Sequence, residues 1–349
     1  GMKFIDADGV FFDENKCNVL FKIAQEENLG NNLNVLKQQV SKYPEAIDIH
    51  LKNVLNLHFL DIDKIKGEKF KVVLDTINGA SCVGFNKLLN QLNCNIVSIN
   101  DIPNGKFPRD PEPNTKNLSQ VSKLVLDSDA DIGIVTDPDG DRLVLIDNKG
   151  KIIIEENTLA LCVDLVLSKT KNLKPLVTNL STSQIIEDIA KKHGVIVNRT
   201  KVGELHVVKR MKELKSIIGG EGNGGIILPE SHFGRDAFVG AIIILDLLAS
   251  SDSNLHEINN SLPKYHMIKE KLNLENEFSE TNIKQKIKEC FKNEIINEQD
   301  GIKIIAKNYW AHIRKSNTEP IVRLFIESED KDLSERTLQM IKNILSIND

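Results

Sequence analysis

Short apolar runs alternate with helical patterns along most of this chain, and this alternation limits its fold more than any other feature. Phe70 to Asp75 predicts a buried strand, and a turn at Asn78-Gly79 follows it. A helical stretch then runs to Leu92, before a second strand near Ile96 to Ile99. Repeated strand-helix-strand units favour parallel sheets covered by helices, so the sequence predicts an α/β fold.

The same alternation returns in the middle of the chain. A strand at Leu176 to Leu180 is followed by a helix to Lys192, which Ser181 is placed to cap. Further along, Asp236 is expected to open a long helix that ends near Leu248. Polar loops follow the strands of both regions, at the positions where open α/β sheets place their ligands.

From Pro263 onward Lys, Glu and Asn become frequent, which predicts a further domain of α+β character. Its expected elements are strands at Trp310 to Ile313 and Ile321 to Ile326 and a final helix at Leu333 to Leu345. Three domains agree with the length, because 349 residues are too many for one ordinary core.

Composition argues against several classes of protein. With 40% hydrophobic and 27% charged residues, the chain is typical of packed globular proteins. Its net charge of -5 provides no broad basic surface, so nucleic acid is not an expected partner. The longest apolar stretch, Val239 to Ala249, contains Asp246 and is too short for a bilayer span, so no membrane partner is expected. Five widely spaced cysteines without a Cys-x-x-Cys pair favour a cytoplasmic location.

Three aspartates, Asp137, Asp139 and Asp141, alternate with a proline and a glycine directly after an expected strand at Ile132 to Val135. Their carboxylates converge only if the backbone curls tightly, and Mg2+ would relieve their repulsion because it prefers hard oxygen ligands. A solvated acidic turn is the alternative. An EF-hand is excluded, because Arg142 stands where that motif needs glycine.

A glycine-rich run from Gly219 to Gly225 contains Glu221 and Asn223. Glycines let the backbone approach a ligand closely, and the carboxylate and amide can bond to sugar hydroxyls. A glycine-rich turn between strands, with no ligand, explains the run equally well. The strand, G-x-G-x-x-G, helix order of a dinucleotide site is absent.

A third polar run places short hydrogen-bonding side chains between Arg314 and Arg323. Guanidinium groups bind phosphate through paired hydrogen bonds, so this run favours an anion site over a solvated basic turn. The short donors between the two arginines include Ser316, Asn317 and Thr318.

Taken in order, the runs DPDGDR, GEGNGG and RKSNTEPIVR resemble the metal, sugar and phosphate loops of the α-D-phosphohexomutase family. This family includes phosphoglucomutases, phosphomannomutases and phosphoglucosamine mutases, and is built from four domains. The resemblance implies consecutive mixed α/β domains, the second and third, followed by an α+β C-terminal domain. The implied division is residues 1–55 as a remnant of the first domain with a connecting helix, 56–156 as the second domain, 157–260 as the third and 261–349 as the fourth.

The resemblance also implies roles for single residues. Asp137, Asp139 and Asp141 would hold Mg2+, and Arg142 would lie near the phosphoryl group in transfer. Lys201 would contact ligand phosphate or assist proton transfer. The residues that would contact the hexose phosphate are Lys201, Gly203, Glu221, Asn223, Arg314, Ser316, Asn317, Thr318 and Arg323. Many relatives have Ser at the position of Asn223, and some have His at that of Glu204, so the choice of hexose and the proton shuttle stay open.

Members of this family relay the phosphoryl group through a serine in a run like T-A-S-H-N-P, followed by one like N-G-x-K-F. Gly1 to Phe4 resembles the second run, so the chain is expected to begin just after the catalytic loop and to lack the phosphoserine. Ser231-His232 is not followed by Asn-Pro and is interpreted as structural. His50 and His58 stand in a helical, partly apolar segment and are expected to be packed.

By resemblance the chain is an isomerase that interconverts hexose 1-phosphates and 6-phosphates by intramolecular phosphotransfer. Without the serine, it is expected to bind hexose phosphates and Mg2+ but not to turn over alone. The alternatives are a non-catalytic phosphosugar sensor and one half of a split mutase, completed by a separate first-domain polypeptide. Residues 1 to about 50 are expected to be weakly ordered or to self-associate, because they would expose Phe4, Val10, Phe11 and Phe12.

Overall fold

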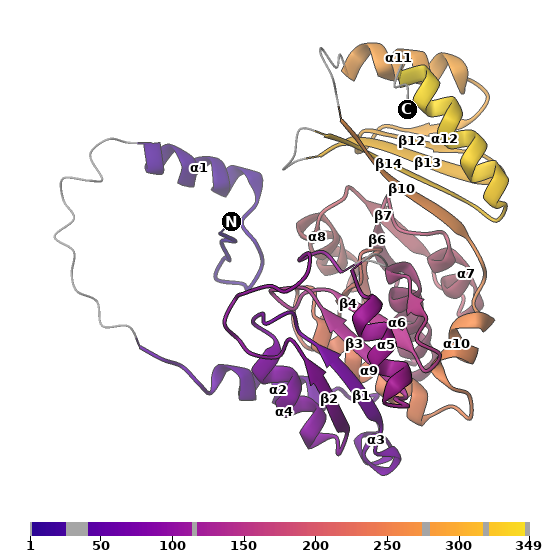
Figure 1. The fold of residues 1–349 in the computed structure, drawn as a ribbon. Coiled ribbons are helices and arrows are strands. Elements are labelled where there is room, and N and C mark those ends of the chain that lie inside the picture. The colour runs from indigo at the N-terminus through magenta and orange to yellow at the C-terminus, as the bar shows by residue number, and fades with distance from the viewer. Residues whose placement is uncertain (1, 26–40, 114–116, 274–279, 317–320, 346–349) are drawn as a thin grey trace. The chain divides into compact units, whose positions relative to one another are not determined.

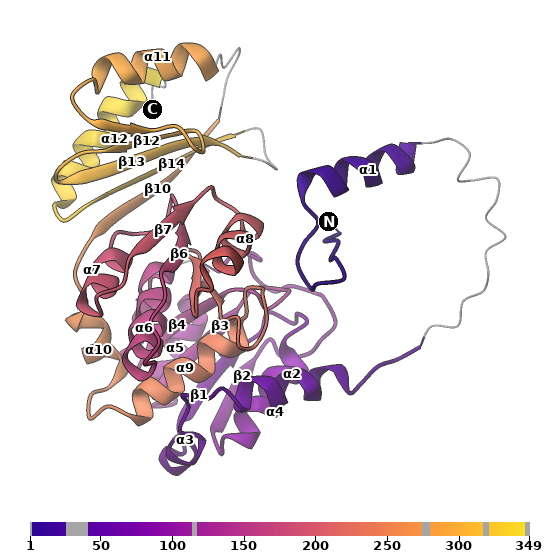
Figure 2. The ribbon, with the colours of Figure 1, turned by 180° about the vertical axis from the view of Figure 1, so that it is seen from behind.

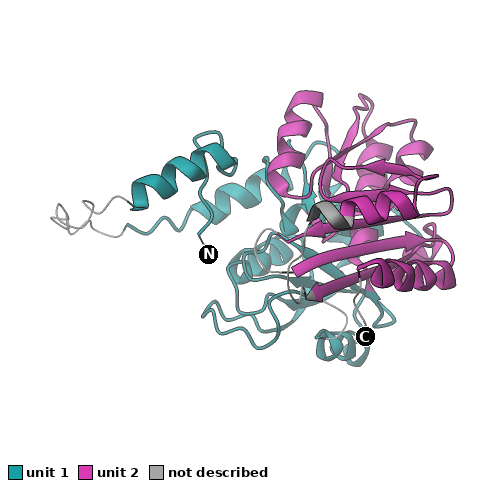
Figure 3. Cartoon of the chain, turned by 90° about the horizontal axis from the view of Figure 1, so that it is seen from above, with its two compact units in different colours: residues 1–152, 226–252 teal, residues 153–225, 253–349 magenta. Residues whose placement is uncertain are grey.

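The computed structural model describes residues 2–25, 41–113, 117–273, 280–316 and 321–345 (Figure 1). The chain divides into two compact units, coloured separately in Figure 3. Unit 1 comprises residues 1–152 and 226–252, and unit 2 comprises residues 153–225 and 253–349. The chain therefore leaves unit 1, builds the first part of unit 2, and returns.

Unit 1 contains a five-stranded sheet in the order β2-β1-β3-β4-β5. Strands β1 and β2 pair in parallel, and β1 pairs in parallel with β3 on its other side, which confirms the predicted strand-helix-strand unit. Strand β4 turns back antiparallel to β3. The bounds are Lys71–Asp75 for β1, Asn95–Ile99 for β2, Ile132–Thr136 for β3, Leu143–Asp147 for β4 and Ile152–Ile153 for β5.

Helices cover this sheet. The hydrophobic face of α5 packs against β1, β3 and β4, whereas α4 contacts β2. Helix α9, which comes from the returning segment, contacts α2, α3 and β4 (Figure 2). The bounds are Ala46–Leu55 for α2, Ile62–Glu68 for α3, Cys82–Gln91 for α4, Ser119–Asp127 for α5 and Ala237–Ala249 for α9.

Helix α9 is buried along almost its whole length, as its apolar sequence predicted. Asp236 caps it, because the Asp236 Oδ1 atom accepts the backbone N–H of Phe238 at 2.8 Å. The buried Asp246 carboxylate accepts the backbone N–H of Asp61 at 3.1 Å. The one acidic side chain within this helix is thus hydrogen-bonded inside the unit.

The next sheet along the chain has the order β7-β6-β8-β9, with β6 parallel to both of its neighbours, and its strands β6, β7 and β8 belong to unit 2. Helix α6 contacts α7 and β8, and α8 contacts β6, β7 and β8. The bounds are Glu155–Lys169 for α6, Leu176–Asn179 for β6, Ile185–Lys192 for α7, Val197–Thr200 for β7, Glu204–Leu214 for α8, Gly219–Glu221 for β8 and Gly225–Ile227 for β9.

The second part of unit 2 is an antiparallel sheet in the order β10-β14-β13-β12-β11, as expected of an α+β region. Helix α12 packs on β10, β13 and β14 and contacts α11. The bounds are Leu255–Ser261 for α10, His266–Asn273 for β10, Glu280–Cys290 for α11, Ile295–Asn297 for β11, Ile302–Ile305 for β12, Tyr309–Lys315 for β13, Ile321–Ser328 for β14 and Lys331–Leu345 for α12.

Three local expectations were wrong. Helix α7 begins at Ile185 with Gln184 at its N-cap, so Ser181 does not cap it. Val10 is buried, although exposure was expected. The His58 side chain is 61% exposed and therefore not packed. Residues 26–40, part of the N-terminal region expected to be weakly ordered, lie outside the described residues, and α1 (Glu14–Gln25) precedes them.

None of the helices in the described parts of the chain combines the length and the apolar character that crossing a bilayer would require.

Candidate functional site

The aspartate run begins where β3 ends, in unit 1. Asp137 Oδ1 accepts the backbone N–H groups of Asp141 at 3.1 Å and Arg142 at 3.2 Å, and these bonds curl the loop. Gly140 adopts a positive φ of 75°, which glycine reaches without strain. One carboxylate oxygen from each of Asp137, Asp139 and Asp141 lies within 4.8 Å of the others. The predicted convergence of the three carboxylates is therefore present.

Two cations from distant parts of the sequence reach this cluster. Arg235 Nη2 donates to Asp141 Oδ2 at 2.5 Å. Lys3 Nζ donates to Asp139 and lies 3.3 Å from Asp141 Oδ2. The predicted Arg142 is also close, with its Nε atom 3.6 Å from Asp137 Oδ2. Sequence reasoning missed Lys3 and Arg235, because no local pattern links either residue to the aspartates.

The electrostatics of the cluster favour an added cation. Burial, followed by the charges of Asp141 and Asp139, raises the pKa of Asp137 to about 7. Burial alone would raise the pKa of Asp141, but Arg235 and Lys3 outweigh it and lower that pKa. Asp141 Oδ1 is buried without a hydrogen-bond partner. Three carboxylates with one unsatisfied buried oxygen fit a hard divalent cation.

The predicted turn at Asn78-Gly79 packs against the backbone of the aspartate run. The backbone N–H of Ala80 donates to the Pro138 carbonyl at 2.8 Å. A Cβ atom on Gly79 would lie 2.4 Å from the same oxygen, so no larger residue fits there without a shift. Ser81 Oγ also lies 2.9 Å from Thr136 Oγ1.

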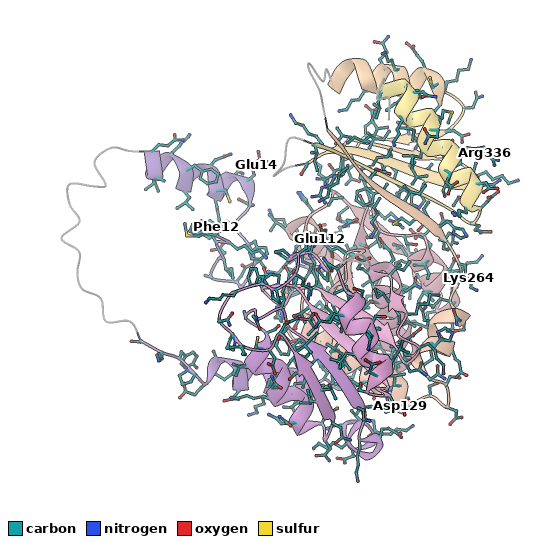
Figure 4. The ribbon with its side chains drawn as sticks, in the orientation of Figure 1. Phe12, Glu14, Glu112, Asp129, Lys264 and Arg336 are labelled. Atoms are coloured by element: carbon teal, nitrogen blue, oxygen red, sulfur yellow. The ribbon has the colours of Figure 1, made fainter. Side chains whose placement is uncertain are left out.

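The loop between β2 and α5 adds a second support. Arg109 Nε donates to Asp75 Oδ2 at 2.9 Å, and its Nη2 donates to the Thr136 carbonyl at 2.8 Å, so one guanidinium joins the ends of β1 and β3. Glu112, labelled in Figure 4, accepts from Arg142 at 3.4 Å. The candidate metal site thus lies at the carboxyl ends of the parallel strands β1 and β3.

In unit 2 the glycine-rich run forms the turn between β8 and β9. Glu221 is 2% exposed, and its Oε1 atom accepts from Asn179 Nδ2 at 2.8 Å and from the backbone N–H of Gly203 at 2.9 Å. Asn223 Oδ1 accepts the backbone N–H of Gly225 at 3.1 Å and closes its own turn. Glu221 therefore brings the predicted Gly203 beside the glycine-rich run, whereas the predicted Lys201 stands two residues earlier and is exposed.

A buried carboxylate that sequence reasoning missed lies under this turn. Glu156 accepts the backbone N–H of Ser183 at 2.9 Å, and Lys269 Nζ lies 3.3 Å from its Oε1 atom. Lys269 also donates to the Gly222 carbonyl at 3.2 Å. A Cβ atom on Gly222 would overlap the Glu156 oxygens at 2.0 Å. Burial raises the pKa of Glu156 to about 7, although Lys269 and the Ser183 bond lower it.

The predicted phosphate run links β13 and β14. Arg314 and Arg323 are directly opposed in the antiparallel ladder, which places their side chains on one face of the sheet. Two guanidinium groups on one face of a sheet can bind one phosphate through paired hydrogen bonds. Ser316 donates its backbone N–H to the Ile321 carbonyl at 2.8 Å. The predicted Asn317 and Thr318 lie outside the described residues.

Asp300 connects the phosphate strands to the loop before α8. Its Oδ2 atom accepts the backbone N–H of Val202 at 2.9 Å and lies 3.3 Å from Arg314 Nε. Its carbonyl accepts from His312 Nε2 at 2.6 Å, and Ser181 Oγ pairs with His312 Nδ1 at 2.8 Å. Burial lowers the pKa of His312 to about 4, so the imidazole is neutral at pH 7 and bonds on both sides. Sequence reasoning missed this network.

Three domain models of one protein family match most of this chain. Residues 48–150 match the phosphoglucomutase/phosphomannomutase α/β/α domain II, residues 155–265 match domain III, and residues 271–344 match the C-terminal domain. The chain belongs to the phosphoglucomutase/phosphomannomutase family. The suspected resemblance and the predicted succession of two α/β domains and an α+β domain are thereby confirmed.

Relatives within this family carry several mutase names. A phosphoglucomutase/phosphomannomutase of Thermococcus kodakarensis is 35% identical, over 97% of this chain and 74% of the relative. A phosphoglucosamine/phosphogalactosamine mutase of Sulfurisphaera tokodaii is 29% identical, over 99% of this chain and 76% of the relative. These phosphohexomutases are isomerases, and their different names leave the hexose of this chain open.

Solved structures of the family share the fold. A family protein from Burkholderia thailandensis superposes with a TM-score of 0.71 at 23% identity, covering 81% of this chain and 63% of that one. A putative phosphomannomutase from Thermus thermophilus also has a TM-score of 0.71, at 18% identity, covering 86% of this chain and 66% of that one. This chain therefore spans slightly less than two thirds of the length of these structures.

Proposed function

We propose that this chain binds hexose phosphates together with Mg2+ and provides the metal, sugar and phosphate loops of a hexose 1-phosphate/6-phosphate mutase. The observation that carries the proposal is the cluster of Asp137, Asp139 and Asp141, whose carboxylates converge in a chain of this family. The unsatisfied Asp141 Oδ1 is the atom best placed to gain from a cation.

In this proposal each loop has one task. Asp137, Asp139 and Asp141 hold Mg2+, which when bound neutralises charge on a phosphoryl group in transfer. Arg142 lies beside the same carboxylates and would face that phosphoryl group.

On the sugar side, Glu221 and Asn223 would orient hydroxyl groups, and Lys201 with Gly203 would contact the ligand. Glu221 Oε1 already holds Gly203 and Asn179, so this residue shapes the loop as well as facing the sugar. Arg314, Ser316, Asn317, Thr318 and Arg323 would bind the phosphate that is not being transferred. The opposed arginines support this role.

The assignment of residues 56–156, 157–260 and 261–349 to the second, third and fourth domains, with 1–55 as a first-domain remnant, remains part of the proposal. For the 349-residue chain assayed alone we expect binding without turnover, because it contains no run like T-A-S-H-N-P.

Isothermal titration calorimetry with glucose 6-phosphate, in the presence and absence of MgCl2, tests binding. Arg323→Ala should abolish the heat, whereas Arg336→Ala, which removes an exposed arginine of α12 (Figure 4), should not. Asp139→Asn should abolish the Mg2+ dependence, and Asp127→Asn is its matched surface control. No heat with glucose, mannose or glucosamine phosphates would refute the proposal.

A coupled mutase assay of the purified chain tests the second part. Turnover without any added polypeptide would refute the expectation of binding alone. Turnover only after co-expression with a first-domain polypeptide would identify a split mutase, and binding without turnover in either case would identify a sensor.

A further inference from the structure

Two histidines and one aspartate meet at the N-terminus of α9 in unit 1, and they are not part of the aspartate run. His50 is on α2, and His232 lies in the segment just before α9. The Nε2 atoms of His50 and His232 lie 3.0 Å and 3.1 Å from the same atom, Asp236 Oδ2. One ligand atom from each of the three side chains lies within 4.8 Å of the others.

The backbone holds the Asp236 carboxylate in place. Its Oδ1 atom accepts the N–H groups of Phe238 and Val239 as the cap of α9, which leaves Oδ2 directed at the two imidazoles. The His50 ring packs edge-on against Phe238, with ring centroids 5.5 Å apart. Two of the three side chains are therefore oriented by contacts that do not involve a ligand.

The cluster is closed on one side and open on the other. The Asp236 side chain is 4% exposed, whereas those of His50 and His232 are 27% and 42% exposed. A metal ion could approach past the imidazoles, and a water molecule could complete its coordination. His50 is partly buried against Phe238, in line with the expectation that it is packed, and its Nε2 atom also meets the buried Asp236 carboxylate.

We propose that His50, His232 and Asp236 form a second metal site, selective for Zn2+. Zinc in proteins is bound by imidazole nitrogen and carboxylate oxygen at about 2.0–2.2 Å, so tetrahedral neighbours lie about 3.3 Å apart. The observed nitrogen-oxygen separations of 3.0 Å and 3.1 Å require only a small expansion. The aspartate run offers oxygen ligands alone and suits Mg2+ instead.

Zn2+ at this site would fasten α2 to the start of α9. The residues on either side of Asp236 hold the aspartate run, because Arg235 donates to Asp141 at 2.5 Å and the Ala237 N–H donates to the Gly140 carbonyl at 3.1 Å. A bound Zn2+ would therefore fix the segment that positions the neighbouring carboxylates.

Equilibrium dialysis of the full chain against ZnCl2 with excess MgCl2 tests the inference, with bound zinc counted by atomic emission. We expect one tightly bound Zn2+ per chain and a higher melting temperature that EDTA reverses. Changing a residue that only supports a metal ligand typically lowers metal affinity by roughly 10–100-fold. The double variant His50→Gln/His232→Gln removes two ligands, so its affinity for Zn2+ should fall by more than this. His58→Gln is the matched control, because His58 pairs with Glu230 outside the cluster.

Further variants separate this site from the proposed function. Asp139→Asn should keep its zinc while losing the Mg2+ dependence of sugar phosphate binding, so either proposal can fail without the other. Co2+ should give visible absorption bands that are lost in the double variant. Equal zinc uptake by the wild type and a folded double variant, judged by circular dichroism, would overturn the inference, as would no uptake by the wild type.

Discussion

Glu156 makes a sharp prediction about stability and pH. Its pKa is raised from 4.5 to about 7, chiefly by burial, so the folded chain holds this proton more tightly than the unfolded chain. The folded state gains stability from the protonated form. This gain is complete below pH 4.5, falls as the pH rises, and is lost above pH 7.

The size of the effect follows from the shift. Each pKa unit corresponds to about 1.4 kcal/mol, and a shift of this size gives a change of roughly 2–3 kcal/mol between pH 5 and pH 8. Glu156→Gln removes the titrating group but keeps an acceptor for the Ser183 N–H. The free energy of unfolding of the wild type minus that of the variant should therefore fall by this amount over the same range.

Urea unfolding at several pH values measures that difference, and the subtraction removes the contributions of all other titrating groups. Glu155→Gln is the matched control, since Glu155 Oε2 lies 3.6 Å from the same Lys269 Nζ but leaves Glu156 in place. A difference that stays constant from pH 5 to pH 8, or one that rises, would contradict a raised pKa of Glu156 in the folded chain.

Two further substitutions test the packing and the loop network. Phe85→Ala should lower the free energy of unfolding by about 3–5 kcal/mol, because Phe85 is fully buried and its ring stacks on that of Phe238 with centroids 4.3 Å apart. A loss below about 1 kcal/mol, measured by urea unfolding, would contradict this expectation. Asp300→Ala should cost about 1.5–3 kcal/mol, because Val202 and Arg314 lose a charged acceptor, and Asp300→Asn should recover part of it. Equal stability of the two Asp300 variants would contradict that account.

Local patterns in the sequence were enough to predict the elements on which the site stands. The apolar run of β1, the buried helix α9 and its Asp236 cap all depend on neighbouring residues, and each is confirmed. The convergence of the aspartates was predictable for the same reason, since Pro138 and Gly140 already require a tight loop.

The missed residues depend on contacts between distant parts of the chain. Ser181 satisfies the rule for a helix cap, but its hydroxyl instead pairs with His312, 131 positions away. Lys3 meets Asp139 across 136 positions. Glu156 carries no local signal, because its raised pKa arises chiefly from burial, and Gly222 and Lys269, which lie beside it, are distant in the sequence. Such partners become visible only when the tertiary fold is known.

The return of the chain to unit 1 has a consequence for how this protein is made. A ribosome releases the whole sheet of unit 1 before it has synthesised α9, the helix that packs on β4, α2 and α3. Until residue 249 has emerged, the nascent chain holds an uncovered apolar surface and an aspartate run without Arg235. Expression of residues 1–153 alone would reproduce that unfinished state, whereas the same fragment joined to 226–252 would not.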